Sequence, residues 1–408
     1  MSASLRSSIF ASNSTAHTSW PWLLFLFSAA GFIEAAFWGH VGAFTPLYLP
    51  GLGVPVDEVA RWTGLSASLS AVLGLPLLPL WGALADRYSR KPIIVRSFVA
   101  HVLAAVIIVL AGNLWVFIAG RAMMSFALGN SGLMMTTLSE RTPRRRLGLA
   151  FSIMNSAPPV GVFIGSLIGG RAVDALGFRT LVTIDAGLVV LIILALGFGY
   201  RDTFTPADRS PILRMAADSV LIIWRSARLK ALFPALFILF AGWMLAFTYV
   251  PLAVTALYRG SDPGTAVGVV LGAGGLATLV LSPAVGALAD RYGHWRVLLA
   301  TACVAVALWP LPALTGNLTE FTLAWAVLNG VISSVFAISF SVLSESAAPG
   351  VRGRVMSFAY LPVSVGFLAG PAIGSLATSG TVFAVFPLAA VLTALGIGAM
   401  WWARGRAV

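Results

Sequence analysis

The chain has 408 residues, of which 59% are hydrophobic and 10% are charged, and its formal net charge is +12 at neutral pH. Because an average soluble domain carries about 25% charged residues, this composition excludes an ordinary water-soluble fold and indicates a membrane protein. The single cysteine, Cys303, excludes an intramolecular disulfide and a thiolate metal cluster, and we expect neither a metal nor a cofactor.

Twelve apolar stretches are long enough for transmembrane helices, because about 20 helical residues cross about 30 Å of hydrocarbon. The stretches are 22–48, 60–80, 97–112, 114–139, 149–172, 179–199, 231–257, 265–285, 297–315, 320–343, 355–377 and 381–402. The sequence therefore predicts an all-α integral membrane protein with twelve transmembrane helices.

The placement of basic residues predicts the orientation of the chain. If the N-terminus is cytoplasmic, the outer loops contain few of the 26 Lys and Arg residues, namely Arg61, Arg171, Arg179 and Arg259. Since cytoplasmic loops carry an excess of these residues, we expect both termini in the cytoplasm and a multi-pass protein of the inner (plasma) membrane. The positive charge then faces anionic lipid of the inner leaflet and does not indicate nucleic-acid binding.

The chain is an internal duplication. The letters GALADRY at 82–88 recur at 286–292, 204 positions later, and the letters LSE at 138–140 recur at 343–345. This repeat predicts two pseudo-symmetric six-helix bundles, in residues 1–200 and 231–408. Between them, residues 201–230 interleave apolar and charged side chains, which predicts a cytoplasmic linker with an amphipathic helix on the membrane surface.

The duplicated segment resembles the signature of the major facilitator superfamily, G-x-L-a-D-r-x-G-r-k, between its second and third helices. The second copy falls between the predicted eighth and ninth helices, where that superfamily repeats the signature, and Ser89 and His294 replace a glycine and a basic residue of the pattern. The resemblance implies a transporter with charge pairs that form and separate at the cytoplasmic mouth. The expected gating residues are Asp86, Arg87, Arg90, Lys91, Glu140, Asp290, Arg291 and Glu345. The alternative is a solvated basic loop without a gating role.

Further segments resemble the twelve-span drug:proton antiporter branch of that superfamily: PLY at 46–48, WG at 81–82, NLW at 113–115, and Arg121. The branch carries a glycine pattern in its fifth helix, in which Ser152 and Ser166 here replace a glycine and a proline. The matching residues are Gly161, Gly165, Gly169 and Gly170, with a second set of Gly366, Gly370 and Pro371 in the eleventh helix. The resemblance implies drug export coupled to protons, although small residues at this spacing also arise from tight helix packing.

Ionisable side chains inside a bilayer are costly, about 2.5–3.5 kcal/mol on insertion scales, and so mark candidate functional sites. Glu34 and Arg121 fall at similar predicted depths, and the resemblance places both on helices that line the central cavity. We expect Glu34 to be the protonatable carboxylate and Arg121 its electrostatic partner, with a static buried ion pair as the alternative. Asp185 is a further proton-coupling candidate, but its peripheral helix favours a structural contact. For His40 and His101 we expect satisfied interfacial positions.

The second half has Glu320, at the edge of a span, as the one charge within its predicted helices. An aromatic, uncharged wall suits a hydrophobic or amphipathic solute, including a cationic one. The candidate cavity residues are Trp243, Phe247, Tyr249, Trp325, Asn329 and Phe336.

The sequence thus predicts a secondary active transporter that exports hydrophobic or amphipathic compounds of the multidrug type in exchange for protons, by alternating access. A lipid or glycolipid flippase on the same fold is an alternative, and so is proton-coupled solute uptake. We expect a monomer with a small lipophilic substrate, protons and membrane lipid as partners. A membrane enzyme is disfavoured because the phosphate-binding pattern G-x-x-x-x-G-K-[ST] and the metalloprotease pattern H-E-x-x-H do not occur.

Overall fold

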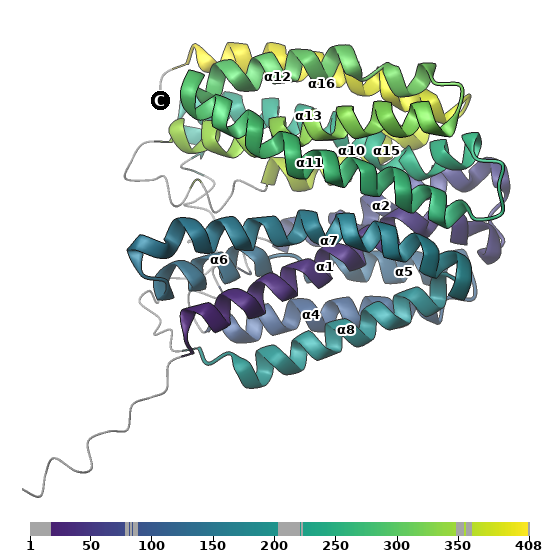
Figure 1. Ribbon diagram of the computed structural model, residues 1–408, viewed down its shortest axis with the longest axis horizontal. Coiled ribbons are helices and arrows are strands. Elements are labelled where there is room, and N and C mark those ends of the chain that lie inside the picture. Colours follow the sequence, from purple (N-terminus) through teal and green to yellow (C-terminus); the bar gives the residue numbers. More distant parts are fainter. Residues whose placement is uncertain are drawn as a thin grey trace, which may run out of the picture.

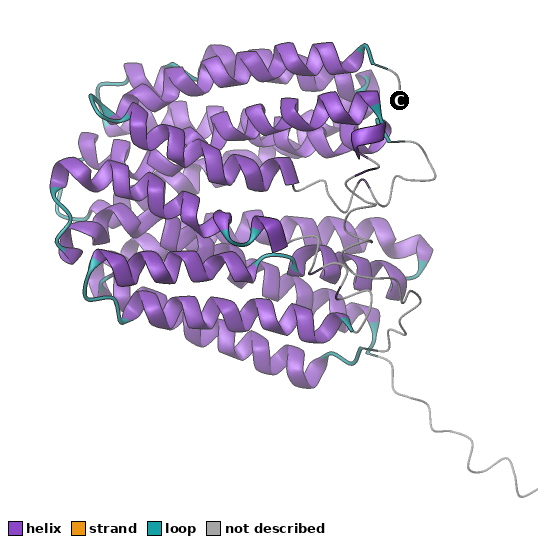
Figure 2. Ribbon diagram, turned by 180° about the vertical axis from the view of Figure 1, so that it is seen from behind, coloured by secondary structure: helices purple, strands orange, loops and turns teal. Residues whose placement is uncertain are grey.

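The computed structural model describes residues 18–77, 81, 84, 89–202, 221, 223–347, 355 and 361–406. Within these residues the secondary structure is helical, with short connecting turns and no strand (Figure 2). A structure built from long apolar helices satisfies its backbone hydrogen bonds internally, as the bilayer core requires. The prediction of an all-α membrane protein is confirmed.

The described helices of the first half pack into one bundle. They are α1 (Trp20–Tyr48), α2 (Val59–Val72), α4 (Arg90–Val109), α5 (Leu114–Met123), α6 (Asn130–Arg141), α7 (Leu147–Leu176) and α8 (Phe178–Gly199). The second half contributes α10 (Ala227–Leu257), α11 (Pro263–Tyr292), α12 (His294–Leu308), α13 (Leu318–Glu345), α15 (Leu361–Ala377) and α16 (Val385–Arg404).

Nine of the described helical segments are long and apolar enough to cross a membrane. The other three predicted spans correspond to α2, to α15 and to the pair α5 and α6, which are shorter in the described part of the chain. Most of the predicted linker, including its proposed amphipathic helix, lies outside the described residues.

The span predicted as one helix over 114–139 is broken. A 3₁₀ turn, Met124–Ala127, follows α5, and Gly129 has φ +103° before α6 begins at Asn130. A residue without Cβ adopts this left-handed conformation readily. The freed carbonyl of Leu128 accepts a 2.9 Å hydrogen bond from Arg96 Nη2. The prediction of a continuous helix was wrong because a single internal glycine does not reveal a break without its tertiary partners.

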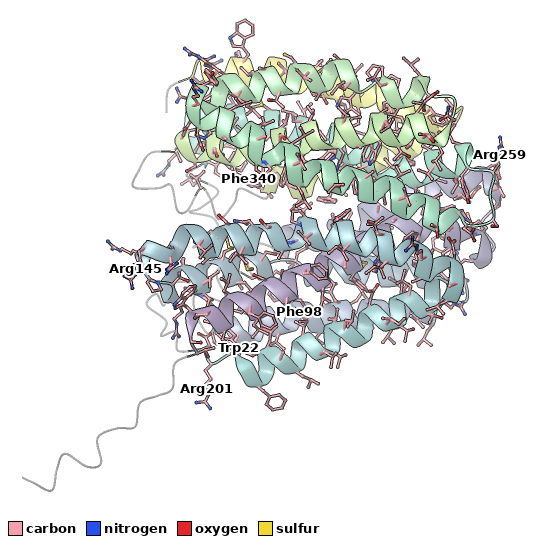
Figure 3. The ribbon with its side chains drawn as sticks, viewed as in Figure 1. Trp22, Phe98, Arg145, Arg201, Arg259 and Phe340 are labelled. Atoms are coloured by element: carbon pink, nitrogen blue, oxygen red, sulfur yellow. The ribbon has the colours of Figure 1, made fainter. Side chains whose placement is uncertain are left out.

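Both ends of the described chain lie at the same end of the molecule, where the chain enters α1 and leaves α16 (Figure 1). We call this the termini end. Arg145 and Arg201 also lie there, whereas Arg259 lies at the opposite end (Figure 3). The two halves contact each other mainly through α7 with α11 and α2 with α15.

Candidate functional site

The glycine pattern of α7 allows this helix to pack directly on α1. A Cβ atom added at Gly161 would meet the carbonyl oxygen of Phe32, and one added at Gly169 would lie 2.5 Å from the His40 ring. At Gly165, the added Cβ would lie 3.0 Å from the side chain of Ala36. Because the three glycines have no side chains, the backbone of α7 can approach α1 closely.

A second face of α7 packs equally closely on α11 of the other half. A Cβ atom at Gly170 would lie 2.5 Å from the carbonyl oxygen of Gly264, and one at Gly268 would meet the carbonyl oxygen of Ser166. Ser166, which replaces the proline of the family pattern, is buried at this contact. The backbone of α7 therefore contacts α1 on one face and α11 of the second half on another.

The second glycine set, on α15, packs on α10 in the second half as the first set on α7 packs on α1. A Cβ atom at Gly370 would lie 2.6 Å from the Ala241 carbonyl oxygen of α10, and Gly366 packs on the same helix. The hydroxyl of Tyr249 donates a 3.0 Å hydrogen bond to the carbonyl oxygen of Pro371. Tyr249 is fully buried in this contact, so the structure places it in helix packing rather than on an open cavity wall.

At the end of the molecule opposite the termini end, a carboxylate of one bundle binds the N-terminus of a helix in the other bundle. Asp174, near the end of α7, accepts hydrogen bonds from the backbone N–H groups of Gly264 at 2.9 Å and Thr265 at 2.6 Å. These groups belong to the first turn of α11, where free N–H groups and the helix dipole favour a negative charge. Sequence reasoning missed Asp174, because its partner is a backbone segment about 90 residues away.

Asp174→Ala is expected to weaken the contact between the two halves at the end opposite the termini end. A carboxylate at an exposed helix start contributes up to ~1 kcal/mol, so the ratio of molecules with this contact formed to molecules with it broken should fall about fivefold. Electron spin resonance distances between labels at Arg171→Cys and Arg259→Cys, in a Cys303→Ser background, would measure this. Asp262→Asn at the same end is the control, and an unchanged distance distribution in Asp174→Ala would contradict the assignment.

Glu34 lies on α1 between two side chains from different helices. Its Oε2 accepts a 2.7 Å hydrogen bond from Asn130 Nδ2, and its Oε1 lies 3.7 Å from His101 Nε2. His101 is fully buried, and its Nδ1 lies 3.0 Å from the carbonyl oxygen of Ser97. Since a carbonyl oxygen only accepts, Nδ1 carries the hydrogen, and a neutral His101 directs the Nε2 lone pair toward Glu34.

Arg121 does not pair with Glu34 in the described structure. Its Nε donates to the carbonyl oxygen of Ser66 at 3.3 Å, and its Nη1 lies 3.7 Å from the sulfur of Met124. The helix break after α5 brings Asn130, the first residue of α6, to Glu34 instead. Sequence reasoning named neither Asn130 nor His101 as a partner of Glu34, because both depend on this break and on the packing of α4.

The aromatic residues predicted to line the cavity form a connected wall on α10 and α13. The ring centroids of Trp243 and Phe336 are 5.4 Å apart, and those of Phe247 and Trp325 are 6.0 Å apart. Asn329 Nδ2 donates to the Gly274 carbonyl oxygen at 3.1 Å. The indole N–H groups of both tryptophans and the Asn329 carbonyl oxygen have no hydrogen-bond partner among the described residues.

An open pocket of about 600 Å³ lies in the first half, between α1 and α7. Its walls include Phe25, Phe32, Ile153 and Val160 together with serine hydroxyls. Pockets of about 300–1,000 Å³ accommodate drug-sized molecules. Sequence reasoning missed this pocket. Its α1 residues share one face of the helix, and Glu34 lies on the opposite face.

The first copy of the charged signature ties three helices of its own bundle together at the termini end. Arg90 donates to both carboxylate oxygens of Glu140, at 2.6 and 2.9 Å, and so links α4 to α6. Lys91 Nζ donates to the Gly197 carbonyl oxygen at the end of α8, at 2.6 Å. The Ser89 hydroxyl donates to Asp202 at 2.7 Å, which gives the residue at the glycine position of the pattern a specific contact. Asp86 and Arg87 lie outside the described residues.

The second copy makes a weaker version of the same link. His294 lies 2.6 Å from Glu345 and 3.2 Å from Asp290 through its two ring nitrogens. The pairs Arg90–Glu140 and His294–Glu345 are equivalent by the repeat, but the His294 side chain is 22% exposed against 5% for Arg90. Arg291 lies over the ring of Tyr292, 5.4 Å from its centroid. The pairs Arg90–Glu140 and His294–Glu345 each join helices within one half.

Arg90→Ala is expected to reduce transport more than His294→Ala. We expect a loss of about tenfold for the buried, bidentate Arg90 and less than about threefold for the more exposed His294. The initial rate of export of a fluorescent amphipathic dye from cells, at matched protein levels, measures both. An equal loss, or a larger loss for His294→Ala, would contradict the ranking of the two links.

The family model of the Major Facilitator Superfamily matches residues 28–308 and 262–407. The multidrug resistance protein MdtG of Proteus mirabilis is 26% identical over 94% of this chain and 96% of its own length. The multi-drug resistance efflux pump PmrA homolog of Lactococcus lactis is 25% identical over 89% of this chain and 90% of its own length.

Solved structures show the same fold at lower identity. The human organic anion transporter MFSD10 has a TM-score of 0.71 at 16% identity and covers 93% of this chain and 99% of its own. The nucleoside transporter NupG has a TM-score of 0.72 at 15% identity, over 94% of this chain and 100% of its own. Both matches extend over the two bundles, as the family match does. The chain therefore belongs to the major facilitator superfamily and resembles its drug:proton antiporter branch.

Proposed function

We propose that this protein exports hydrophobic or amphipathic compounds in exchange for protons. The observation that carries the proposal is the carboxylate of Glu34, which is only 13% exposed, accepts a hydrogen bond from Asn130 and lies 3.7 Å from His101. The similarity to the MdtG and PmrA multidrug proteins over most of the chain supports the substrate class.

Glu34 has a hydrogen-bonding arrangement for each protonation state. When protonated, its Oε1–H can donate to the Nε2 lone pair of His101 after a small approach from 3.7 Å, while Oε2 accepts from Asn130. When ionised, it keeps the Asn130 bond at the start of α6, where the helix dipole favours a negative charge, but its Oε1 faces the Nε2 lone pair of His101. Proton loss therefore pushes Glu34 away from α4.

The two apolar surfaces would receive the substrate. The pocket between α1 and α7 offers volume next to Phe32, and the aromatic wall offers faces for a cationic or apolar group. The unpartnered indole N–H group of Trp243, whose side chain is only partly buried, would donate a hydrogen bond to a substrate acceptor. Glu34 lies on the opposite face of α1 from the pocket, so a substrate there and a proton on Glu34 would influence each other through the packing of α1.

We propose that the termini end is cytoplasmic, because the basic residues gather there. The contacts of α7 with α11 and of Asp174 with the start of α11 then close the outer side of the described conformation. The charge pairs at the cytoplasmic side lie within each half and leave the halves free to separate there. Rocking of the two bundles about α7 and α11 would expose the central site to either side.

Reconstituted protein in liposomes with an imposed pH gradient tests the proposal. Amphipathic cationic dyes should drive proton movement, and the gradient should drive dye accumulation. Labelled phospholipid is the comparison, because a flippase with the same apolar pocket would move lipid instead. Lipid movement without dye-driven proton movement would overturn the proposal, and so would dye uptake along the direction of proton flow.

A further inference from the structure

His40 joins three helices through its two ring nitrogens. Nδ1 lies 2.8 Å from Asp185 Oδ2 of α8, and Nε2 lies 2.8 Å from the carbonyl oxygen of Gly165 in α7. The side chains of His40 and Asp185 are only 7% and 5% exposed. The contact depends on Gly165 and Gly169, because α7 approaches the ring closely only where it lacks side chains.

The hydrogen bonds of this pair fix the number of protons it holds. A carbonyl oxygen cannot donate, so the contact with Gly165 requires a hydrogen on His40 Nε2. The 2.8 Å contact with Asp185 requires one further hydrogen, either on Nδ1 or on the carboxyl group. Both arrangements are neutral overall. Each holds one proton more than a neutral imidazole beside an ionised carboxylate.

We propose that His40 and Asp185 form a second proton-binding site, which is loaded in the described conformation and releases its proton when transport loosens the contacts of His40 with α7 and α8. The proposal rests on the proposed function and adds a proton to its stoichiometry. It concerns a different part of α1 from Glu34, six residues or ~9 Å further along the helix.

Loss of the proton cannot be accommodated in the observed geometry. With Nε2–H retained, the Nδ1 lone pair would face an ionised Asp185 at 2.8 Å. With the hydrogen moved to Nδ1, the Nε2 lone pair would face the Gly165 carbonyl oxygen instead. Either choice replaces a hydrogen bond with a repulsive contact inside the membrane, so deprotonation breaks the contact of α1 with α8 or with α7.

The position of α7 connects this site to transport. The face of α7 opposite its α1 contact packs on α11 of the other half, where Gly170 approaches Gly264. Asp185 is the charged group that acts on His40, and the α7 surface against the ring is formed by Gly165 and Gly169. From α1 itself, the Phe44 ring stacks on the imidazole at 6.2 Å. Among the described residues, Asp185 is the one charged group that acts on His40. The contact of α7 with the ring therefore depends on the proton of the His40–Asp185 pair, and the proton depends on that contact.

The variant Asp185→Asn removes the extra proton of the pair but keeps the hydrogen bonds that pack α1 against α7 and α8. An asparagine can donate its Nδ2–H to Nδ1 while Nε2–H still donates to Gly165, so the geometry survives with no extra proton. The ratio of protons to dye molecules, measured from reversal potentials in liposomes, should fall from about two to about one, with export retained. Asp57→Asn, an exposed carboxylate, is the control. A wild-type ratio in Asp185→Asn would overturn the proposal.

A second measurement does not depend on transport. The chain has only four histidines, so ¹⁵N imidazole spectra of the full protein can be assigned with His40→Gln. The His40 nitrogens should change between about pH 5 and about pH 9 in wild type and lose this change in Asp185→Asn. Spectra that do not change with pH would overturn the second site. A wild type with no dye-driven proton movement would instead overturn the proposed function.

Discussion

Glu34→Gln is expected to reduce dye-driven proton movement to the level of protein-free liposomes. The amide nearly preserves the volume of the side chain and still accepts a hydrogen bond from Asn130, but it cannot bind or release a proton. Binding of dye to the purified protein, followed by tryptophan fluorescence, should therefore persist within about threefold of wild type. The change removes the proton site on one face of α1 and leaves the pocket on the other face intact.

The matched control for this variant is Asp57→Asn, which makes the same chemical change at an exposed carboxylate before α2. It should export dye at the wild-type rate. If Glu34→Gln instead accumulates dye against a gradient as well as wild type does, Glu34 is a structural hydrogen-bond acceptor and proton coupling lies elsewhere. Loss of both binding and transport would point to damage of the α1, α4 and α6 packing.

Gly170→Ala is expected to shift the protein toward an open opposite end and to inactivate transport. Its Cβ would lie 2.5 Å from the backbone oxygen of Gly264, so α7 and α11 must move apart. Overpacking of this kind costs about 1–3 kcal/mol, which changes the ratio of the two conformations by roughly 5- to 150-fold. In Gly170→Ala, the mean distance between spin labels at positions 171 and 259 should be longer than in Asp174→Ala.

Gly187→Ala is the control for helix propensity and for the added methyl group. Gly187 lies on the exposed surface of α8, and its added Cβ would meet no atom within 4 Å. This variant should keep the distances and the transport rate of wild type. A Gly170→Ala protein with unchanged distances would mean that α7 and α11 can absorb a methyl group, and that their close approach does not set the conformation.

The fold was predictable because its signals are local or repeated. The duplicated GALADRY segment and the apolar stretches predict two bundles of membrane helices, and the family match supports them. The glycines Gly161, Gly165 and Gly170 were also identified, through the resemblance to the family's glycine pattern. Their physical role, contact with α1 on one face and α11 on another, required the structure.

The partners of the membrane carboxylates were not predictable, because they depend on where helices meet. Estimated depth suggested Arg121 for Glu34, but the break at Gly129 gives Asn130 that position. Asp185 was expected to make a structural contact on a peripheral helix, and the structure gives it His40 as a hydrogen-bond partner. Its role in proton coupling stays a prediction, as do the roles of the gating and cavity residues.

The break before α6 also makes the two halves mechanically unequal. The equivalent span of the second half, α13, runs unbroken over Leu318–Glu345, whereas α5 and α6 are separated by a 3₁₀ turn and Gly129. A helix that loses consecutive i to i−4 hydrogen bonds in its middle opens locally at a lower free energy than an intact one. The guanidinium of Arg96, which lies 3.5 Å from the Trp81 ring centroid and bonds Leu128, limits that opening. Among the described residues, this break gives the first half a more easily deformed segment next to Glu34, which the unbroken α13 lacks.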